Sequence, residues 1–392
     1  MAGTIEPYDT SNGRRYMVRY RKPDKTQTKK RGFRTKKEAE LFLARVTTAK
    51  AEGDYIDPAR GRITVGDLAP SWLRRKKSLK PSSFKSIETS WRVHVAPKWG
   101  GRGVTTIEAT EVEHWIQDML EGVAESARER RTKKDTQPLS ATVILRALGV
   151  LGGILDDAQR DRRIAKNPAR GVTNLPRKAS KKDRRYLTDA QVAQLASAVK
   201  DPQLAVLVLV LAYTGIRWGE AIGLRVKHVN FLRHRLHIRE NAVQVNSEIH
   251  VGEPKSWERR TVPFPVFLTR ALEALTAGKG PGDLVFASAS GSHLLRPRTS
   301  ATSGSWFVAA QRTADIPLLT LHDLRHTAAS LAISAGANVK VVQKMLGHKS
   351  AAMTLDTYAD LFDDDLDSVA ELMHTRGVQT ATAALARIGL TA

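Results

Sequence analysis

Six side chains in the second half of the sequence suit chemistry on a phosphate ester. Two arginines offer forked donors that match phosphate oxygens and stay charged at any ordinary pH. Two histidines can accept or donate a proton and a lysine can donate one, while a tyrosine hydroxyl can attack phosphorus. In chain order these candidates are Arg217, Lys255, His322, Arg325, His348 and Tyr358.

The local sequence predicts an element for each of the first two candidates. An apolar helix ends at Gly215, so Arg217 should lie near the first turn of the next helix. Two segments that alternate apolar and polar residues, Arg235–Glu240 and Ala242–Val251, predict strands before Lys255. Lys255 is therefore expected on or beside a hairpin.

The other four candidates are expected on helices or at helix ends. His322 and Arg325 are three residues apart at the start of a predicted helix, so they share one face. His348 comes just after the glycine that ends another helix. Tyr358 is expected on a short helix, for which Thr354 is the predicted cap.

Each of these features alone has an ordinary structural explanation. An arginine at a helix start is usually a solvated charge, and a histidine after glycine can simply adjoin a helix C-cap. A single lysine or tyrosine indicates almost nothing. The information lies in the whole set and its order.

The ordered set resembles the tyrosine recombinase family. That family's pattern is Thr-Gly-x-Arg-x-x-Glu, a hairpin lysine, His-x-x-Arg, Leu-Gly-His and a nucleophilic tyrosine about ten residues later. The resemblance is close over residues 186–365, and a lesser mismatch is Asp360, where many relatives have histidine. The matching residues are Thr214, Gly215, Arg217, Glu220, Lys255, His322, Arg325, Leu346, Gly347, His348 and Tyr358.

The resemblance implies a site-specific recombinase of the phage-integrase type, which integrates and excises DNA at attachment sites through a Holliday junction. Tyr358 would attack a phosphodiester, form a 3′-phosphotyrosine and release a 5′-hydroxyl. Because the covalent intermediate keeps the energy of the broken bond, rejoining needs no ATP. No metal, nucleotide or other cofactor is expected.

Roles for the remaining candidates follow from the same chemistry. Arg217 and Arg325 would neutralise the nonbridging oxygens as charge builds on phosphorus. A free phenol has a pKa of about 10, so the tyrosine needs a base or an orienting group, and His322 is the expected one. His348 would hydrogen-bond the transition state, and Lys255 would protonate the leaving oxygen.

Composition agrees with a DNA-binding enzyme. The chain has 392 residues, with 63 Lys and Arg against 40 Asp and Glu, and its formal net charge of +23 makes nucleic acid the default partner. The absence of cysteine excludes disulfides, thiolate zinc sites and a cysteine nucleophile. The longest apolar run, Leu204–Tyr213, is about half the length of a membrane span. The expected location is the cytoplasm of a bacterial host, at its nucleoid.

The expected fold class is multidomain and mainly α with small β elements. Length predicts two or three domains, and basic or breaker-rich stretches place the boundaries. The expected parts are a small β-sheet plus helix that binds arm-type DNA (1–62), a four-helix core-binding domain (63–172), a basic linker (173–186), an α+β catalytic domain of tyrosine-recombinase type (187–365) and a C-terminal tail (366–392).

The N-terminal part concentrates positive charge. Residues 14–37 hold twelve basic residues and one acid. Strands are predicted at Tyr16–Tyr20 and Lys29–Phe33, followed by a helix that Thr35 caps and that ends near Ala51. A basic disordered tail is the alternative. Together with the linker, this part supplies the DNA-binding candidates Arg14, Arg15, Arg19, Arg21, Lys29, Lys30, Arg31, Lys181, Lys182 and Arg184.

Capping patterns predict the helices of the middle part. The expected starts are Thr64, Pro81, a capping box of Thr110 with Glu113, and Ser140, and a further box at Thr188 with Gln191 opens the catalytic part. Residues 121–138 are expected to form a mobile loop. The tail should carry an apolar face (Val369, Leu372, Met373) and a possible second segment (383–388).

The expected partners are double-stranded attachment sites of core and arm types, copies of the chain in a tetramer on synapsed DNA, a host DNA-bending protein and a directionality factor. No membrane partner is expected. The tail's apolar face should pack on a neighbouring protomer or on its own domain.

Two other functions use part of this pattern. A type IB topoisomerase has a similar residue set, but the basic N-terminal part and the helical middle part favour site choice and synapsis. A DNA-binding regulator could use residues 322–346 as a helix-turn-helix, but it has no use for Arg217, Lys255 and Tyr358 together.

Overall fold

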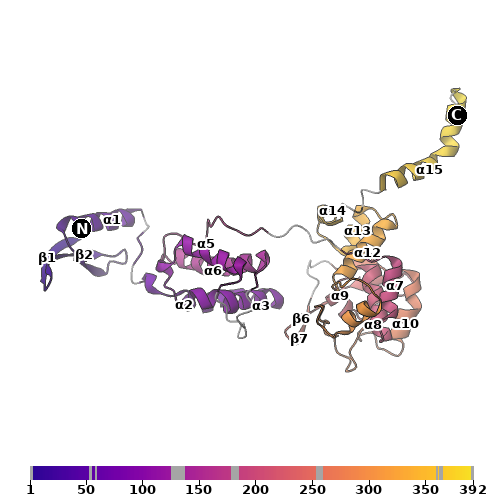
Figure 1. The fold of residues 1–392 in the computed structure, drawn as a ribbon, viewed down its shortest axis with the longest axis horizontal. Helices are drawn as coiled ribbons and strands as arrows, with labels where there is room; N and C mark the ends of the chain where they lie inside the picture. The colour runs from indigo at the N-terminus through magenta and orange to yellow at the C-terminus, as the bar shows by residue number, and fades with distance from the viewer. Residues whose placement is uncertain are drawn as a thin grey trace. The chain divides into compact units, whose positions relative to one another are not determined.

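The computed structural model describes residues 3–52, 55–57, 60–124, 137–177, 185–252, 259–358, 361 and 365–389. The chain divides into two compact units, 1–180 and 181–392 (Figure 1). Helices dominate and the sheets are small and antiparallel, which confirms the predicted fold class. Lys181, Lys182, Arg184, Lys255 and most of the predicted loop 121–138 lie outside the described residues.

A three-stranded antiparallel sheet with one helix opens the first unit, with α1 beside the sheet in Figure 1. The two predicted strands and the helix are present, and the Thr35 hydroxyl caps the helix by accepting from the Glu38 amide. An additional strand, β1, was not predicted because it is an outer strand that contains Pro7, a residue tolerated at sheet edges. The elements are β1 (Thr4–Thr10), β2 (Gly13–Arg21), β3 (Gln27–Phe33) and α1 (Lys36–Ala51).

Strand alternation separates the basic side chains of this sheet into two faces. Val18 and Tyr20 are buried against α1. Their neighbour Arg19 points to the other face, where it lies opposite Lys29 in the register of β2 with β3. The ammonium of Lys30 instead lies 4.5 Å from the centre of the Phe42 ring of α1. Lys30 is thus on the helix side, whereas Arg19 and Lys29 lie on the face opposite α1, where the Arg19 guanidinium also pairs with Glu6 at 3.3 Å.

The rest of the first unit is a helical domain around a tryptophan-rich core. The rings of Trp99 and Trp115 meet edge to face at 5.7 Å, and both side chains are buried. A Cβ at Gly153 would lie 2.7 Å from the Trp72 ring, so this glycine allows α2 and α6 to approach closely. The helices are α2 (Val65–Lys76), α3 (Pro81–Ser90), a π-turn (Trp91–Val95), α4 (Ala96–Trp99), α5 (Ala109–Glu121) and α6 (Ala141–Arg160).

One predicted helix start in this domain is wrong. The capping box of α5 is formed by Glu108 and Glu111, not by Thr110 and Glu113. Glu113 lies inside the helix, and its carboxylate accepts hydrogen bonds from Thr173. The sequence pattern could not separate two overlapping boxes that are offset by two residues.

The second unit surrounds a mainly aliphatic core with helices and two small sheets. Its first helix has the predicted Thr188–Gln191 capping box. The elements are α7 (Asp189–Ser197), α8 (Pro202–Thr214), α9 (Trp218–Ile222), a sheet of β4 (Val229–Asn230), β5 (Arg235–Ile238) and β8 (Arg260–Pro263), a hairpin of β6 (Asn241–Val245) and β7 (Glu248–Gly252), α10 (Thr269–Thr276), α11 (Trp306–Thr313), α12 (Asp323–Ser334), α13 (Val339–Leu346), α14 (Ala351–Tyr358) and α15 (Asp365–Arg387).

Three further predictions in this unit need correction. Ala242–Val251 is two strands, because Asn246 has a positive φ of 58° and turns the chain between them. Thr354 does not cap the tyrosine helix, which begins at Ala351. The tail is one continuous helix through Arg387, not two segments. No helix in the described part of the chain is long and apolar enough to cross a membrane.

Candidate catalytic site

The turn between α8 and α9 places the first candidate. Gly215 ends α8 with a positive φ of 63°, and a Cβ there would lie 2.6 Å from the Leu346 side chain and 3.2 Å from Ala328. Only glycine fits both the conformation and the close packing of α8 against α12 and α13. The turn makes Arg217 the N-cap residue of α9, as the sequence predicted.

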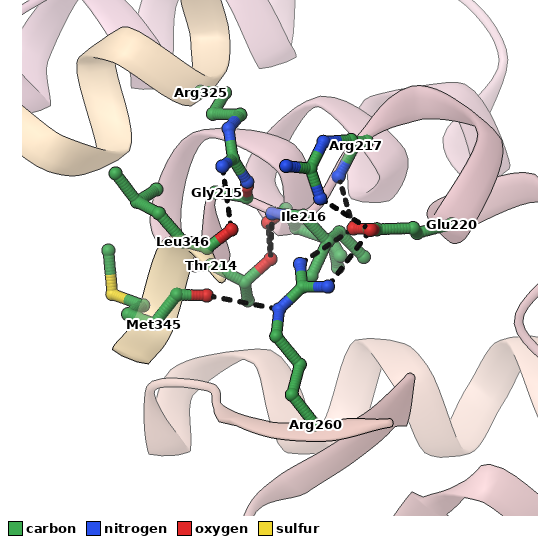
Figure 2. Close-up of polar contacts among 10 residues, drawn as sticks. Thr214, Gly215, Ile216, Arg217, Glu220, Arg260, Arg325, Met345 and Leu346 are labelled. Atoms are coloured by element: carbon green, nitrogen blue, oxygen red, sulfur yellow. Dashed lines mark hydrogen bonds and ion pairs between the residues drawn. The ribbon is translucent and has the colours of Figure 1, made fainter. Parts of the chain in front are cut away.

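Glu220 holds Arg217 from one side, and a second arginine holds Glu220 from the other (Figure 2). The Arg217 backbone amide and its Nη1 donate to the two carboxylate oxygens at 2.8 and 2.9 Å. Arg260 of β8 donates to the same two oxygens through Nη2 and Nη1, at 2.7 and 2.9 Å. Glu220 is 1% exposed. Burial alone would raise the pKa of its carboxyl, but the bonds and charges of Arg260 and the charge of Arg217 hold the pKa at about 2.

Arg325 is fixed by two backbone carbonyls. Its Nη1 donates to Gly215 and its Nη2 to Leu346, each at 2.6 Å (Figure 2). The residue is buried, and burial together with the charge of Arg217 lowers the pKa of Arg325 to about 9. The side chain therefore still carries its charge at neutral pH. It links the end of α8 to the end of α13.

A cavity of about 270 Å³ opens beside these arginines. Arg217, His322 and Arg325 line it, together with Arg296 and residues of β6. Three arginines around a cavity of this size suit an anionic group such as a phosphodiester. Among the described residues that line this cavity, neither His348 nor Tyr358 is present.

The two predicted histidines lie next to this positive charge. Burial and then Arg325 lower the pKa of His322, and the same two causes lower the pKa of His348 to about 4. Nδ1 of His348 lies 3.0 Å from the hydroxyl of Thr354, a buried residue inside α14. The imidazole of His348 is therefore neutral at pH 7, and the arginines supply the positive charge.

Tyr358 ends α14 among buried side chains. It is 1% exposed, and its ring stacks on His348 with 6.5 Å between centroids and 8° between planes. Its hydroxyl oxygen lies 2.8 Å from Nδ1 of His326. The His326 ring in turn meets His322 edge to face at 5.0 Å. In this structure the tyrosine hydroxyl is thus bonded to His326, whereas the expected orienting group was His322.

The structure brings together five of the six candidates, and Lys255 lies outside the described residues. Two further residues of the site were not found from the sequence. His326 directly follows Arg325, and its spacing from His322 is the i, i+4 of one helix face, which is the only signal that could have found it. Arg260 is one of two adjacent arginines in a basic chain, so nothing in the sequence indicates that it is buried.

Glu220 should be a large local contributor to stability. Its pKa is lowered from 4.5 to about 2, so its stabilisation is present above pH 4.5 and is lost as the pH falls towards 2. We expect Glu220→Gln to destabilise the domain by about 3 kcal/mol at pH 7, and the deficit to shrink at pH 3. Scanning calorimetry of the full chain at both pH values measures this. Glu273→Gln, an exposed change on α10, is the control, and an equal deficit at both pH values would contradict the assignment.

Comparison with known proteins gives the family. Residues 185–364 match the phage integrase family and residues 8–50 match an arm DNA-binding domain. The integrase of Mycobacterium phage D29 is 24% identical over 340 residues, which cover 83% of this chain and 84% of the relative. Further relatives are named tyrosine recombinases.

Solved structures share the fold. The integrase of transposon Tn1549, in complex with transposon right end DNA, has a TM-score of 0.62 and 19% identity, and covers 79% of this chain and 100% of its own. A lambda integrase tetramer bound to a Holliday junction has a TM-score of 0.56 and 16% identity, with coverage of 88% and 96%.

Proposed function

Through residues 185–364 the chain belongs to the phage integrase family of tyrosine recombinases, and on that premise we propose that it cleaves and rejoins DNA at specific attachment sites through Tyr358. The observation that carries the proposal is the placement of Arg217, His322 and Arg325 around one cavity. Tyr358 lies nearby, since it stacks on His348 and interacts electrostatically with Arg325. Two arginines beside one cavity do not serve stability, because like charges close together repel each other.

The proposed reaction has two matched transfers. The Tyr358 oxygen bonds to phosphorus and its proton passes to His322, while the bond from phosphorus to the 5′-oxygen breaks and that oxygen takes a proton from Lys255. Joining is the reverse reaction with a 5′-hydroxyl from the partner strand. Arg217 and Arg325 stabilise the charge that builds on the nonbridging oxygens. The neutral His348 hydrogen-bonds the transition state without adding charge.

The nucleophile must move for this reaction. Its hydroxyl is bonded to His326 and its side chain is buried, whereas the cavity is lined by other residues. We propose that DNA binding brings Tyr358 out of this position and into line with the phosphate.

Lys255 is the proposed general acid. We expect Lys255→Ala to slow cleavage of a normal duplex by about 100-fold, because general acid catalysis contributes on this scale. A duplex with sulfur in place of the 5′-bridging oxygen should be cleaved at nearly the wild-type rate, since a thiolate leaves without protonation. Equal defects on both duplexes would place the acid elsewhere.

The arm domain is proposed to bind a second class of site. The face of its sheet opposite α1 carries Arg19 and Lys29, and the matched family is named for arm DNA. We expect a chain that begins at residue 63 to keep cleavage of core sites and to lose footprints on arm sites. Arg19→Ala with Lys29→Ala should weaken the same footprints, whereas Lys30→Ala, on the helix side, should have less effect. Unchanged arm footprints in the shortened chain would refute the proposal.

Copies of the chain are proposed to assemble as a tetramer on synapsed DNA, as the lambda integrase does on a Holliday junction. The tail helix α15 carries apolar side chains that are exposed in the single chain, among them Leu372, Met373 and Leu385. We propose that this face docks on a neighbouring protomer. A host DNA-bending protein and a directionality factor complete the proposed assembly, in the bacterial cytoplasm.

Two assays on the same plasmids, recombination and supercoil relaxation, test the function. Duplex half-sites are first selected from random-sequence DNA by binding to the purified chain, and two half-sites are joined to make each full site. Plasmids that carry two such full sites should then recombine, without added metal or ATP. Relaxation of supercoils without exchange between sites would indicate a topoisomerase instead.

A further inference from the structure

Arg260 has the properties of a working part of the site. Its side chain is 9% exposed, yet it is charged, and a buried charge is costly unless it is paired. Besides its two bonds to Glu220, its Nε lies 3.4 Å from the carbonyl oxygen of Met345. Its aliphatic part packs on Gly347, where a Cβ would lie 2.9 Å from Arg260 Cδ. One side chain thus contacts two of the motifs that carry catalytic candidates.

The geometry assigns Arg260 as the residue that positions Arg217, with Glu220 as the link between them, and this inference rests on the proposed function. Figure 2 shows the carboxylate of Glu220 between the two arginines. Each carboxylate oxygen accepts one bond from Arg217 and one from Arg260. The planar fork of Arg260 therefore fixes the rotation of the carboxylate, and the carboxylate fixes Arg217.

The arrangement leaves Arg217 able to bind a substrate oxygen. Arg217 is 27% exposed and lines the cavity. Arg260 is only 9% exposed and is not one of the residues that line this cavity. In the described part of the chain, the side-chain bonds of Arg217 use only Nη1. Its other nitrogens are donors that a phosphate oxygen can occupy. Arg260 sets the position of this group without touching the phosphate itself.

Arg260→Lys separates position from charge. Lysine keeps the positive charge but has a single ammonium, which cannot hold both oxygens of Glu220. We expect cleavage of the selected duplex to slow by about 100-fold, the scale that a small misplacement of a catalytic group costs. Binding of the half-site should change by less than about twofold. Arg225→Lys is the matched control, because Arg225 also pairs with both oxygens of a glutamate, Glu240, but lies outside the cavity.

A neutral substrate distinguishes positioning from a structural role. A methylphosphonate at the scissile position replaces one charged nonbridging oxygen by a methyl group, so less charge has to be neutralised. If Arg260 acts through Arg217, the defect of Arg260→Lys should fall by about tenfold or more on this substrate, as the demand for charge stabilisation falls. A defect of the same size on both duplexes would overturn the inference, since a loosened domain slows both alike.

A double-mutant cycle tests the link through Glu220 and serves if Arg260→Lys folds poorly. In a Glu220→Gln background the carboxylate is gone, so adding Arg260→Met should cause little further loss on the phosphate duplex. If the rate defects of Glu220→Gln and Arg260→Met multiply in the double variant, the two residues act independently, which would contradict the inference. Failure of the wild-type chain to form any adduct would instead refute the proposed function, and the inference with it.

Discussion

Tyr358→Phe is expected to abolish the covalent complex with DNA and leave DNA binding intact. The change removes only the hydroxyl, so the ring still packs on His348 and within the buried cluster. The lost contact to His326 costs stability only about 1 kcal/mol. No other group replaces a covalent nucleophile, so we expect adduct formation to fall by more than about a thousandfold.

Denaturing gels with a nicked duplex that traps the intermediate measure this effect. Tyr213→Phe is the control in the same domain, because the Tyr213 hydroxyl is also hydrogen-bonded, to Asp189 at 2.7 Å. This variant should form the adduct at the wild-type level. An adduct that survives in Tyr358→Phe would mean that a different residue attacks the phosphate.

The second large effect is expected for Arg325→Lys. Arg325 reaches the carbonyls of Gly215 and Leu346 at once, and one ammonium cannot span both. The variant keeps its charge but loses the orientation of its donors, so cleavage should slow by about 100- to 1,000-fold, the range seen when a preorganised donor is removed. A carbonyl left unpaired also costs about 1–3 kcal/mol of stability.

Single-turnover cleavage of the nicked duplex, together with half-site binding, separates these effects. The affinity for the half-site should remain within about threefold of wild type, because lysine keeps the positive charge and many other basic residues also contribute to DNA binding. Arg312→Lys, an exposed change on α11, should leave cleavage unaffected. Cleavage by Arg325→Lys at close to the wild-type rate would show that charge alone suffices there.

Local sequence signals predicted much of the fold. The hydroxyls of Thr35, Thr64 and Thr188 cap helices where the sequence placed them, because a capping bond joins residues only three apart. Gly215 and Gly347 end helices, as predicted, and the structure gives both a positive φ. The error at Thr110 arose because two possible capping boxes overlap with an offset of two residues. At Thr354 the helix has already begun at Ala351, and the Ser350 hydroxyl accepts from the Met353 amide.

The candidate site was predictable only as far as its motifs. The types and order of the residues indicated the chemistry, but the partner of each side chain depends on distant segments. Arg260 is forty residues from Glu220 in sequence, and His326 meets Tyr358 across 32 residues. Neither pairing leaves a periodic or capping signal, so both required the folded structure.

The most direct test of the central claim is to identify the residue that carries the DNA. The adduct formed by the wild-type chain on the nicked duplex is digested with nuclease and protease, and the modified peptide is sequenced by mass spectrometry. We expect a nucleotide joined through a 3′-phosphate to Tyr358. A nucleotide on any other residue, or recombination without a covalent adduct, would contradict the account.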